Sequence, residues 1–174
     1  KHTNPKTGRF IQKHELKKNL DSVVNKYDYF IDYPWFYKDL YKFLDQCYPG
    51  SLFILTVRPE DTWMKSTASW FDSSGYSHQK KGNKDYKKPK NDHLLFKTVY
   101  GNDLEKGLKR YKQHNDECIK YFAKRPKDFL VFNAFNGDGF NQLCEFLGTP
   151  YDVIERSKAK TREFPHANKQ RYKK

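Results

Sequence analysis

The chain has 174 residues, 36% of them hydrophobic and 17% aromatic, which predicts one domain over residues 1–174 with a core built largely on Phe and Tyr. The formal net charge of +13 favours an anionic partner, and a solubilising surface of solvated Lys side chains is a second account of this surplus. No membrane span is expected, because no run of about 18 apolar residues is present. No secretory signal is visible either, so the compartment stays open, with the cytoplasm favoured.

The first fifty residues contain three expected elements after a basic opening loop, Lys1 to Lys13. Glu15 to Asn25 predicts a short helix, because its apolar residues recur on one face. Tyr27 to Ile31 is a short apolar run and predicts a strand that ends at Asp32. Pro34 then opens a second helix, since the first helical turn tolerates a residue without an N–H. The apolar faces of these two helices consist of Leu16, Leu20, Val23 and Val24, and of Phe36, Leu40, Phe43, Leu44 and Cys47.

The stretch from Leu52 to Phe71 predicts a strand followed by a helix. Leu52 to Val57 is apolar without alternation, as in a strand that is buried on both faces of a parallel sheet. Pro59 stops the strand, and a helix is expected from Glu60 onward. Arg58 therefore lies where the strand ends and the helix begins, at the crevice where open α/β folds bind ligands.

Arg58 and Ser66 form the candidate anion site. The guanidinium of Arg58 can donate two parallel hydrogen bonds to a phosphate, and Ser66, eight residues later, can offer a hydroxyl to the same anion. The alternative is that Arg58 forms a surface salt bridge with Glu60 or Asp61 and that Ser66 is a solvated helix residue. The spacing alone leaves both interpretations open.

Asp32 is the candidate general base. At the end of its strand it would face the same crevice as Arg58, and a carboxylate there could take the proton from an acceptor hydroxyl. The alternative is that Asp32 caps the helix that starts at Pro34, two residues later. One residue could serve both roles.

The second half begins with an exposed basic loop over residues 73–92, rich in Lys, Gly, Ser and Asn. This loop is interpreted either as a lid or acceptor-binding flap with an anionic preference, or as a solvated insertion. A long helix is expected from Asn102 or Asp103 to about Ala123, because its apolar residues form one stripe. Phe129 to Phe132 is a further apolar run and predicts a parallel strand.

A last helix completes the predicted fold. It follows the turn Asn136 to Gly139, is expected to be capped by Asp138, and ends at Gly148 before the basic segment 151–174. The order of elements predicts an α/β fold, a three-layer sandwich in which helices flank a central, mainly parallel sheet. No metal site is predicted, because the widely spaced cysteines lack zinc-ligand spacing and read as buried free thiols: Cys47, Cys118 and Cys144.

Three blocks of the sequence resemble the sulfotransferases that use 3′-phosphoadenosine 5′-phosphosulfate as the sulfate donor: Tyr27 to Ser66, His114 to Pro150 and Phe164 to Lys169. The hallmark of that family after a central strand is an Arg, then a Pro, then a Ser eight residues after the Arg. The closest branch typically reads ILTVRDP, with a Trp five residues after the Arg. Ile54 to Arg58 and Trp63 match this pattern, whereas Pro59 comes one position early.

The resemblance implies a P-loop NTPase-like sulfotransferase fold in which Arg58 and Ser66 hold the 3′-phosphate of the donor. The product would then be adenosine 3′,5′-bisphosphate. The resemblance also implies that Asp32 occupies the place of the catalytic His of the cytosolic sulfotransferases. The sulfuryl group is expected to pass, without a metal, to a hydroxyl or amine of an acceptor such as a glycan or a small alcohol. Phe164 to Lys169 is expected either to fold back over the nucleotide site or to form a basic tail.

The loop that binds the 5′-phosphosulfate is expected upstream of Lys1, which would leave the fold N-terminally incomplete. The alternative is Pro5 to Gly8, since PKTG resembles the PKxGT loop of the family, which aims backbone N–H groups and a Lys at the phosphosulfate. Two features disfavour this alternative. No apolar strand precedes Pro5, and Arg9 and Phe10 replace the small hydroxyl residues that normally follow the Gly.

Three rival functions are weighed against this one. A nucleotide kinase would need a full GxxxxGK[ST] loop, which the sequence lacks. A basic module that binds nucleic acid or another polyanion would account for the net charge and would bind in a salt-sensitive way, although a nucleotide is favoured over nucleic acid. A catalytically inactive relative of the sulfotransferases would account for a missing phosphosulfate loop.

Overall fold

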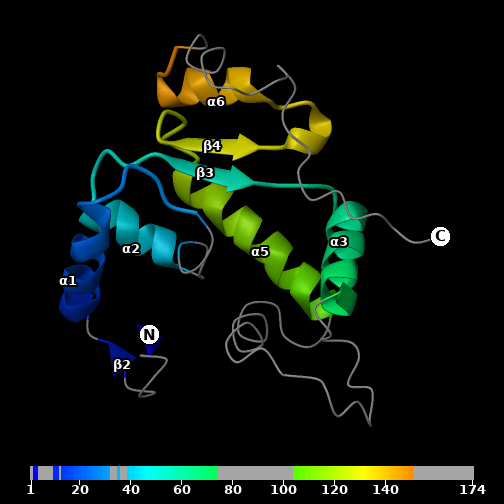
Figure 1. The fold of residues 1–174 in the computed structure, drawn as a ribbon, viewed down its shortest axis with the longest axis horizontal. Coiled ribbons are helices and arrows are strands. Elements are labelled where there is room, and N and C mark those ends of the chain that lie inside the picture. Colours follow the sequence, from blue (N-terminus) through cyan, green and yellow to red (C-terminus); the bar gives the residue numbers. More distant parts are fainter. Residues whose placement is uncertain are drawn as a thin grey trace. The chain divides into compact units, whose positions relative to one another are not determined.

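The structure is a computed structural model, and it describes residues 2–3, 10–11, 13–31, 35, 39–73 and 104–150 (Figure 1). The chain divides into two compact units, residues 1–51 and residues 52–174. None of the helices in the described ranges is both long and apolar enough to cross a bilayer.

The first unit contains a small hairpin and two helices. Strand β1, His2–Thr3, pairs antiparallel with β2, Phe10–Ile11, so the opening segment is not wholly the loop that its polar composition predicts. Helix α1, Lys13–Val24, confirms the first predicted helix, and its Leu20 is buried. Helix α2, Leu40–Cys47, confirms the second, with Leu40 and Tyr41 buried.

The expected strand from Tyr27 to Ile31 is wrong. These residues form no strand, and the side chains of Tyr27, Tyr29 and Ile31 are 64%, 80% and 71% exposed. The Phe30 ring packs instead on Trp35, with ring centres 4.4 Å apart, and edge-on against Tyr27. An apolar run becomes a strand only where a neighbouring strand accepts its backbone hydrogen bonds, and local aromatic packing is what forms here.

The start of α2 also differs from the expectation. The helix begins at Leu40, with Asp39 at the N-cap position, and the Asp39 side chain accepts no capping hydrogen bond from the helix N–H groups. That carboxylate pairs instead with Lys42, at 2.7 Å. Pro34, the predicted first helical residue, lies outside the described residues.

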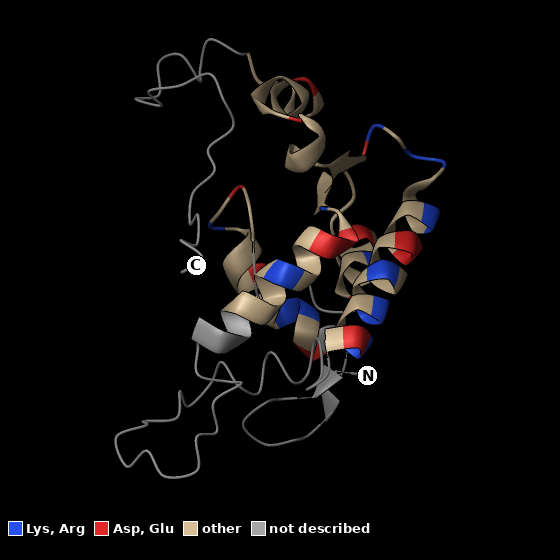
Figure 2. Ribbon diagram, turned by 90° about the vertical axis from the view of Figure 1, so that its right-hand side faces the viewer, with Lys and Arg blue, Asp and Glu red and all other residues tan. Residues whose placement is uncertain are grey.

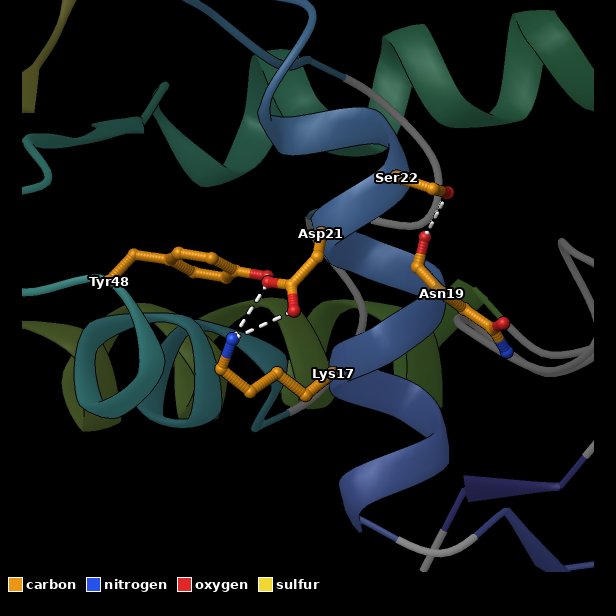
Figure 3. A network of polar contacts seen from close by, with 5 residues as sticks. All are labelled: Lys17, Asn19, Asp21, Ser22 and Tyr48. Carbon is orange, nitrogen blue, oxygen red and sulfur yellow. Dashed lines mark hydrogen bonds and ion pairs between the residues drawn. The ribbon is translucent and has the colours of Figure 1, made fainter.

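A polar network links α1 to the end of α2 within the first unit (Figure 3). The Asp21 carboxylate accepts hydrogen bonds from Lys17 at 2.8 Å and from the Tyr48 hydroxyl at 2.7 Å. The bond from Lys17, which has the larger effect, and the bond from Tyr48 both lower the pKa of Asp21 below its usual value. Burial, together with the bond to Asp21, raises the pKa of Tyr48 to about 12.

The second unit is built on two parallel strands, β3, Phe53–Thr56, and β4, Phe129–Phe132. Their register pairs Phe53 with Phe129 and Thr56 with Phe132. The described helices of this unit are α3, Glu60–Ser73; α5, Leu104–Phe122; the short 3-10 helix η1, Ala134–Asn136; and α6, Phe140–Leu147. The mixed α/β class and the parallel pairing are confirmed. The three-layer sandwich stays a prediction, since the described part of this unit contains two strands.

The core of the second unit centres on Phe122, which is 2% exposed. Its ring stacks on Phe129, with centres 4.7 Å apart, and packs on Phe53 at 4.9 Å. The last residue of α5 therefore covers the first pair of both strands. Cys118 and Cys144 are buried free thiols, as predicted, whereas the free thiol of Cys47 is half-buried.

Strand β3 is not buried on both faces, contrary to the expectation from its unbroken apolar sequence. Its residues alternate between half-buried and exposed, and Ile54 is 40% exposed. Helix α5 packs through Phe122 on the face of β3 that carries Phe53. The opposite face, which carries Ile54, remains partly exposed to solvent. Composition alone does not reveal this asymmetry, because both faces carry apolar side chains.

Candidate phosphate-binding site

Arg58 lies at the edge of the sheet where β3 and β4 both end. The last ladder bond joins the Val57 N–H to the Phe132 carbonyl at 2.8 Å. Arg58 follows directly on β3, and the loop Asn133 to Asp138 follows on β4. Because parallel strands end at the same edge, the two segments meet at the edge of the sheet where the ligand is expected.

The Arg58 guanidinium is oriented from two sides. Its Nε donates a hydrogen bond to the Thr62 hydroxyl at 3.3 Å, and that hydroxyl donates in turn to the Pro59 carbonyl at 2.8 Å. The guanidinium carbon lies 4.4 Å from the centre of the Phe135 ring. A guanidinium held at Nε and at one face can still present its terminal Nη donors to an oxyanion, in the forked geometry that suits phosphate.

The surface salt bridge predicted as the alternative for Arg58 is absent among the described residues. The Glu60 carboxylate pairs with Lys112 at 2.8 Å, and the Asp61 carboxylate lies 3.6 Å from Lys65. The hydrogen bond that Lys112 donates to Glu60 raises the pKa of Lys112, as expected for a cation that gains a carboxylate partner. Both nearby acids are therefore engaged elsewhere, which favours an external anion as the partner of Arg58.

Ser66 lies on α3 one turn beyond Thr62, so the two hydroxyls share a face of the helix. Its side chain is half-buried rather than fully solvated. No hydrogen bond joins Arg58 to Ser66 among the described residues; Thr62 is the residue of α3 that Arg58 contacts. The Arg58 guanidinium thus lies beside the start of α3, and the Thr62 and Ser66 hydroxyls lie on the first two turns of that helix.

The loop after β4 is shaped by its own polar groups. The Asp138 carboxylate accepts a hydrogen bond from the Asn133 N–H at 2.6 Å, and the Asn133 side chain accepts one from the Phe135 N–H at 3.1 Å. Gly137 takes φ of 97°, a left-handed conformation that side chains disfavour. These contacts close the loop and turn the Phe135 ring, 48% exposed, toward Arg58.

The expected role of Asp138 as the cap of α6 is wrong. The N-cap position belongs to Gly139, whose N–H donates to the Gln142 side chain at 2.8 Å. Asp138 is one residue too early to reach the first turn, and its carboxylate is used inside the preceding loop. The predicted end of the helix at Gly148 is confirmed, since Gly148 takes φ of 63°.

Tyr111, from the middle of α5, is a member of this site that the sequence pattern did not predict. Its hydroxyl accepts a hydrogen bond from the Arg58 N–H at 2.8 Å and donates one to the Arg58 carbonyl at 3.1 Å. Its ring stacks on the buried Trp63 of α3, with centres 5.1 Å apart.

The sequence pattern therefore did not predict three residues that contact Arg58, and these residues differ in how strong a signal the sequence carries for them. Thr62 lies four residues from both Arg58 and Ser66, a spacing that places it on the Ser66 face of a helix. Phe135 follows the neighbouring parallel strand, so its loop had to reach the same edge. Tyr111, 53 residues from Arg58, gave no local signal.

Several predicted site segments lie outside the described residues. These are the general-base candidate Asp32, the loop candidate Pro5 to Gly8, and the basic segments 74–92 and 151–174, which include Phe164 to Lys169. Over the described part of the chain, no group of three or more His, Cys, Asp or Glu side chains could hold a metal ion.

Comparison with known proteins gives one match. A family model described as a sulfotransferase domain matches residues 1–172, and so spans both compact units. Neither the curated proteins nor the solved structures compared with the chain include a significant match.

Proposed function

The chain belongs to the sulfotransferase domain family, and from this premise we propose that it moves a sulfuryl group from 3′-phosphoadenosine 5′-phosphosulfate to a hydroxyl or amine of an acceptor. The acceptor oxygen or nitrogen forms the new bond to sulfur and loses its proton to a base. The bond from sulfur to the 5′-phosphate oxygen breaks, and adenosine 3′,5′-bisphosphate leaves with the electron pair. Both units are proposed to form one domain, since the family model spans them.

Arg58 is the residue that best supports this proposal. Its backbone and side chain are held at a strand exit by Tyr111, Thr62 and Phe135, and its neighbouring carboxylates are paired elsewhere. We assign Arg58 to the 3′-phosphate of the donor, with the Ser66 hydroxyl as a second ligand one turn beyond Thr62. A charge-assisted bond of this kind is about twice as strong as a neutral one.

Asp32 is proposed as the general base that takes the acceptor proton. The 5′-phosphosulfate is proposed to bind a loop of backbone N–H groups, located upstream of Lys1 or at Pro5 to Gly8. Sulfuryl transfer, like phosphoryl transfer, depends on alignment of the reactants and on stabilisation of charge on oxygen. Backbone N–H groups, Lys and Arg can supply that positive field, so the proposal requires no metal.

A direct assay tests the proposed reaction. The chain is incubated with the donor carrying radiolabelled sulfate and with a panel of glycans, peptides and small alcohols. We expect label to move to at least one acceptor class and adenosine 3′,5′-bisphosphate to appear in equal amount. Tight binding of the bisphosphate without transfer to any acceptor would instead identify an inactive relative.

A polyanion-binding module is the alternative, and the net charge of +13 is the observation that favours it. However, α1, α2, α3 and α5 each carry charges of both signs rather than one basic face, and the one charged residue of α6 is the acid Glu145 (Figure 2). In α5, for example, the acids Glu105, Asp116 and Glu117 share the helix with Lys106, Lys109 and Arg110. Competition separates the two functions, because adenosine 3′,5′-bisphosphate would not displace nucleic acid or heparin from a general polyanion site.

A further inference from the structure

We propose that Tyr111 is a positioning residue for the phosphate site: its hydroxyl fixes the backbone of Arg58, and thereby sets the selectivity for a nucleotide with a 3′-phosphate. This inference rests on the proposed binding of the 3′-phosphate by Arg58. It assigns to Tyr111 no contact with the nucleotide.

The two hydrogen bonds of Tyr111 take the place of a neighbouring strand. Backbone N–H and C=O groups alternate between the two edges of a strand. The N–H groups of Phe53 and Val57 point to the β4 side, where they bond to Asp128 and Phe132. The N–H and the carbonyl of Arg58 therefore point away from β4. The Tyr111 hydroxyl accepts a hydrogen bond from this N–H at 2.8 Å and donates one to this carbonyl at 3.1 Å.

The Tyr111 ring joins this backbone to the helix that carries Ser66. It stacks on Trp63, at an interplanar angle of 20°, in the first turn of α3. The adjacent residue of α5, Lys112, pairs with Glu60 at 2.8 Å, also in the first turn of α3. The Tyr111 side chain thus contacts both Arg58, two residues before α3, and Trp63 within α3, so it sets where Arg58 lies relative to Ser66.

The position of the Arg58 backbone matters because its guanidinium has fixed neighbours. Thr62 bonds to Nε and Phe135 lies under the guanidinium face, and both contacts require the Arg58 Cα to stay in place. Bidentate recognition of phosphate depends on the fork geometry, so a shift of the backbone weakens it more than it weakens a simple charge contact. A purely structural role for Tyr111 would lower stability without changing which nucleotide is preferred.

The experiment measures the selectivity ratio, defined as the affinity for adenosine 3′,5′-bisphosphate divided by the affinity for adenosine 5′-phosphate. Isothermal titration calorimetry is carried out on the full chain and on Tyr111→Phe, Arg58→Ala and the double variant. Tyr48→Phe is the matched control, because it removes a hydroxyl that bonds to Asp21 rather than to Arg58. Circular dichroism verifies that each variant is folded at the assay temperature.

We expect Tyr111→Phe to lower the selectivity ratio about five- to tenfold, the effect of losing one or two net hydrogen bonds. In the Arg58→Ala background, Tyr111→Phe should change the ratio no further, since it acts through Arg58. Tyr48→Phe should leave the ratio unchanged. Should Tyr111→Phe fail to fold, Tyr111→His, which keeps a ring near Trp63 but is too short to reach Arg58, should lower the ratio in the same way.

Two contrary results are distinguishable. If Arg58→Ala lowers the ratio and folded Tyr111→Phe does not, the role of Tyr111 is overturned and the proposed function stands. If the unaltered chain shows no preference for the 3′-phosphate, the assignment of Arg58 fails, and the role of Tyr111 fails with it.

Discussion

The guanidinium carbon of Arg58 lies 4.4 Å from the centre of the Phe135 ring, although 77 residues separate them in the sequence. The contact joins the segments that follow β3 and β4, and it exists because these strands are parallel neighbours. A cation over an aromatic face is restricted in orientation without a partner of opposite charge. Arg58 is therefore held in place while its charge remains available to an anion.

Replacement of Phe135 by Leu should weaken binding of adenosine 3′,5′-bisphosphate about two- to fivefold. Leu keeps an apolar side chain but removes the ring face, and an exposed cation–π contact contributes about 0.5–1 kcal/mol. Phe135→Tyr, which keeps the ring, is the matched control and should bind as the unaltered chain does. Equal affinities for Leu and Tyr variants in calorimetry would mean that the ring does not orient Arg58.

Loss of Arg58 should have a larger effect. We expect Arg58→Ala to weaken binding of adenosine 3′,5′-bisphosphate by about 2–3 kcal/mol, because a charge-assisted pair is lost. The affinity of Arg58→Lys should lie between those of the unaltered chain and Arg58→Ala, since an ammonium keeps the charge but cannot donate two parallel hydrogen bonds. Unchanged affinity of the Ala variant would remove Arg58 from the nucleotide site.

Asp32→Asn separates proton transfer from a structural role of Asp32. Asn keeps the size and polarity of Asp but cannot take the proton of the acceptor, so sulfate transfer should fall by about 10²- to 10⁴-fold. The melting temperature and the affinity for adenosine 3′,5′-bisphosphate should stay unchanged. Retained transfer in Asp32→Asn, together with a lower melting temperature in Asp32→Ala, would assign Asp32 a structural role alone.

Phe122→Ala should destabilise the second unit by about 3–5 kcal/mol, because it leaves a cavity between Phe53 and Phe129. Ile119→Ala is the control on the same helix, since Ile119 is 44% exposed and its truncation should cost about 1 kcal/mol or less. Urea denaturation of both variants gives the comparison. Similar losses of unfolding free energy in the two variants would contradict the assignment of Phe122 to the core.

The Tyr48–Asp21 bond should make stability depend on pH at both extremes. The pKa of Tyr48 is raised to about 12, so its contribution is complete below about pH 10 and is lost as the pH rises from about 10 to 12. The pKa of Asp21 is lowered, so its contribution is complete above the usual carboxyl pKa and is lost as the pH falls below it.

The test compares the unfolding free energy of the unaltered chain with that of Tyr48→Phe across this range. The unaltered chain should be the more stable near pH 7, and the difference should shrink above pH 10 and again in acid. Phe keeps the ring, so the comparison isolates the hydroxyl. A difference that stays constant from pH 7 to pH 12 would show that the hydroxyl does not titrate as the network requires.

Much of the local structure followed from sequence pattern. The apolar periodicity of α1 and α5, the short apolar runs of β3 and β4, and the Gly148 helix end all appear where they were expected. Each depends on residues close in the chain, whose spacing alone reveals the period. The candidate strand Tyr27 to Ile31 failed for the complementary reason, because a strand also requires a distant partner.

The position of Arg58 at a strand exit was determined by the sequence alone, since the apolar run, the Pro and the following helix are contiguous. Its surroundings were decided only by the tertiary structure. Phe135 and Tyr111 reach Arg58 from loops and helices far along the chain, and the nearby acids Glu60 and Asp61 are paired with other residues. Contacts of this kind come from the parallel pairing of β3 with β4 and from the packing of α5 on α3. They join residues far apart in the chain, so no local sequence pattern predicts them.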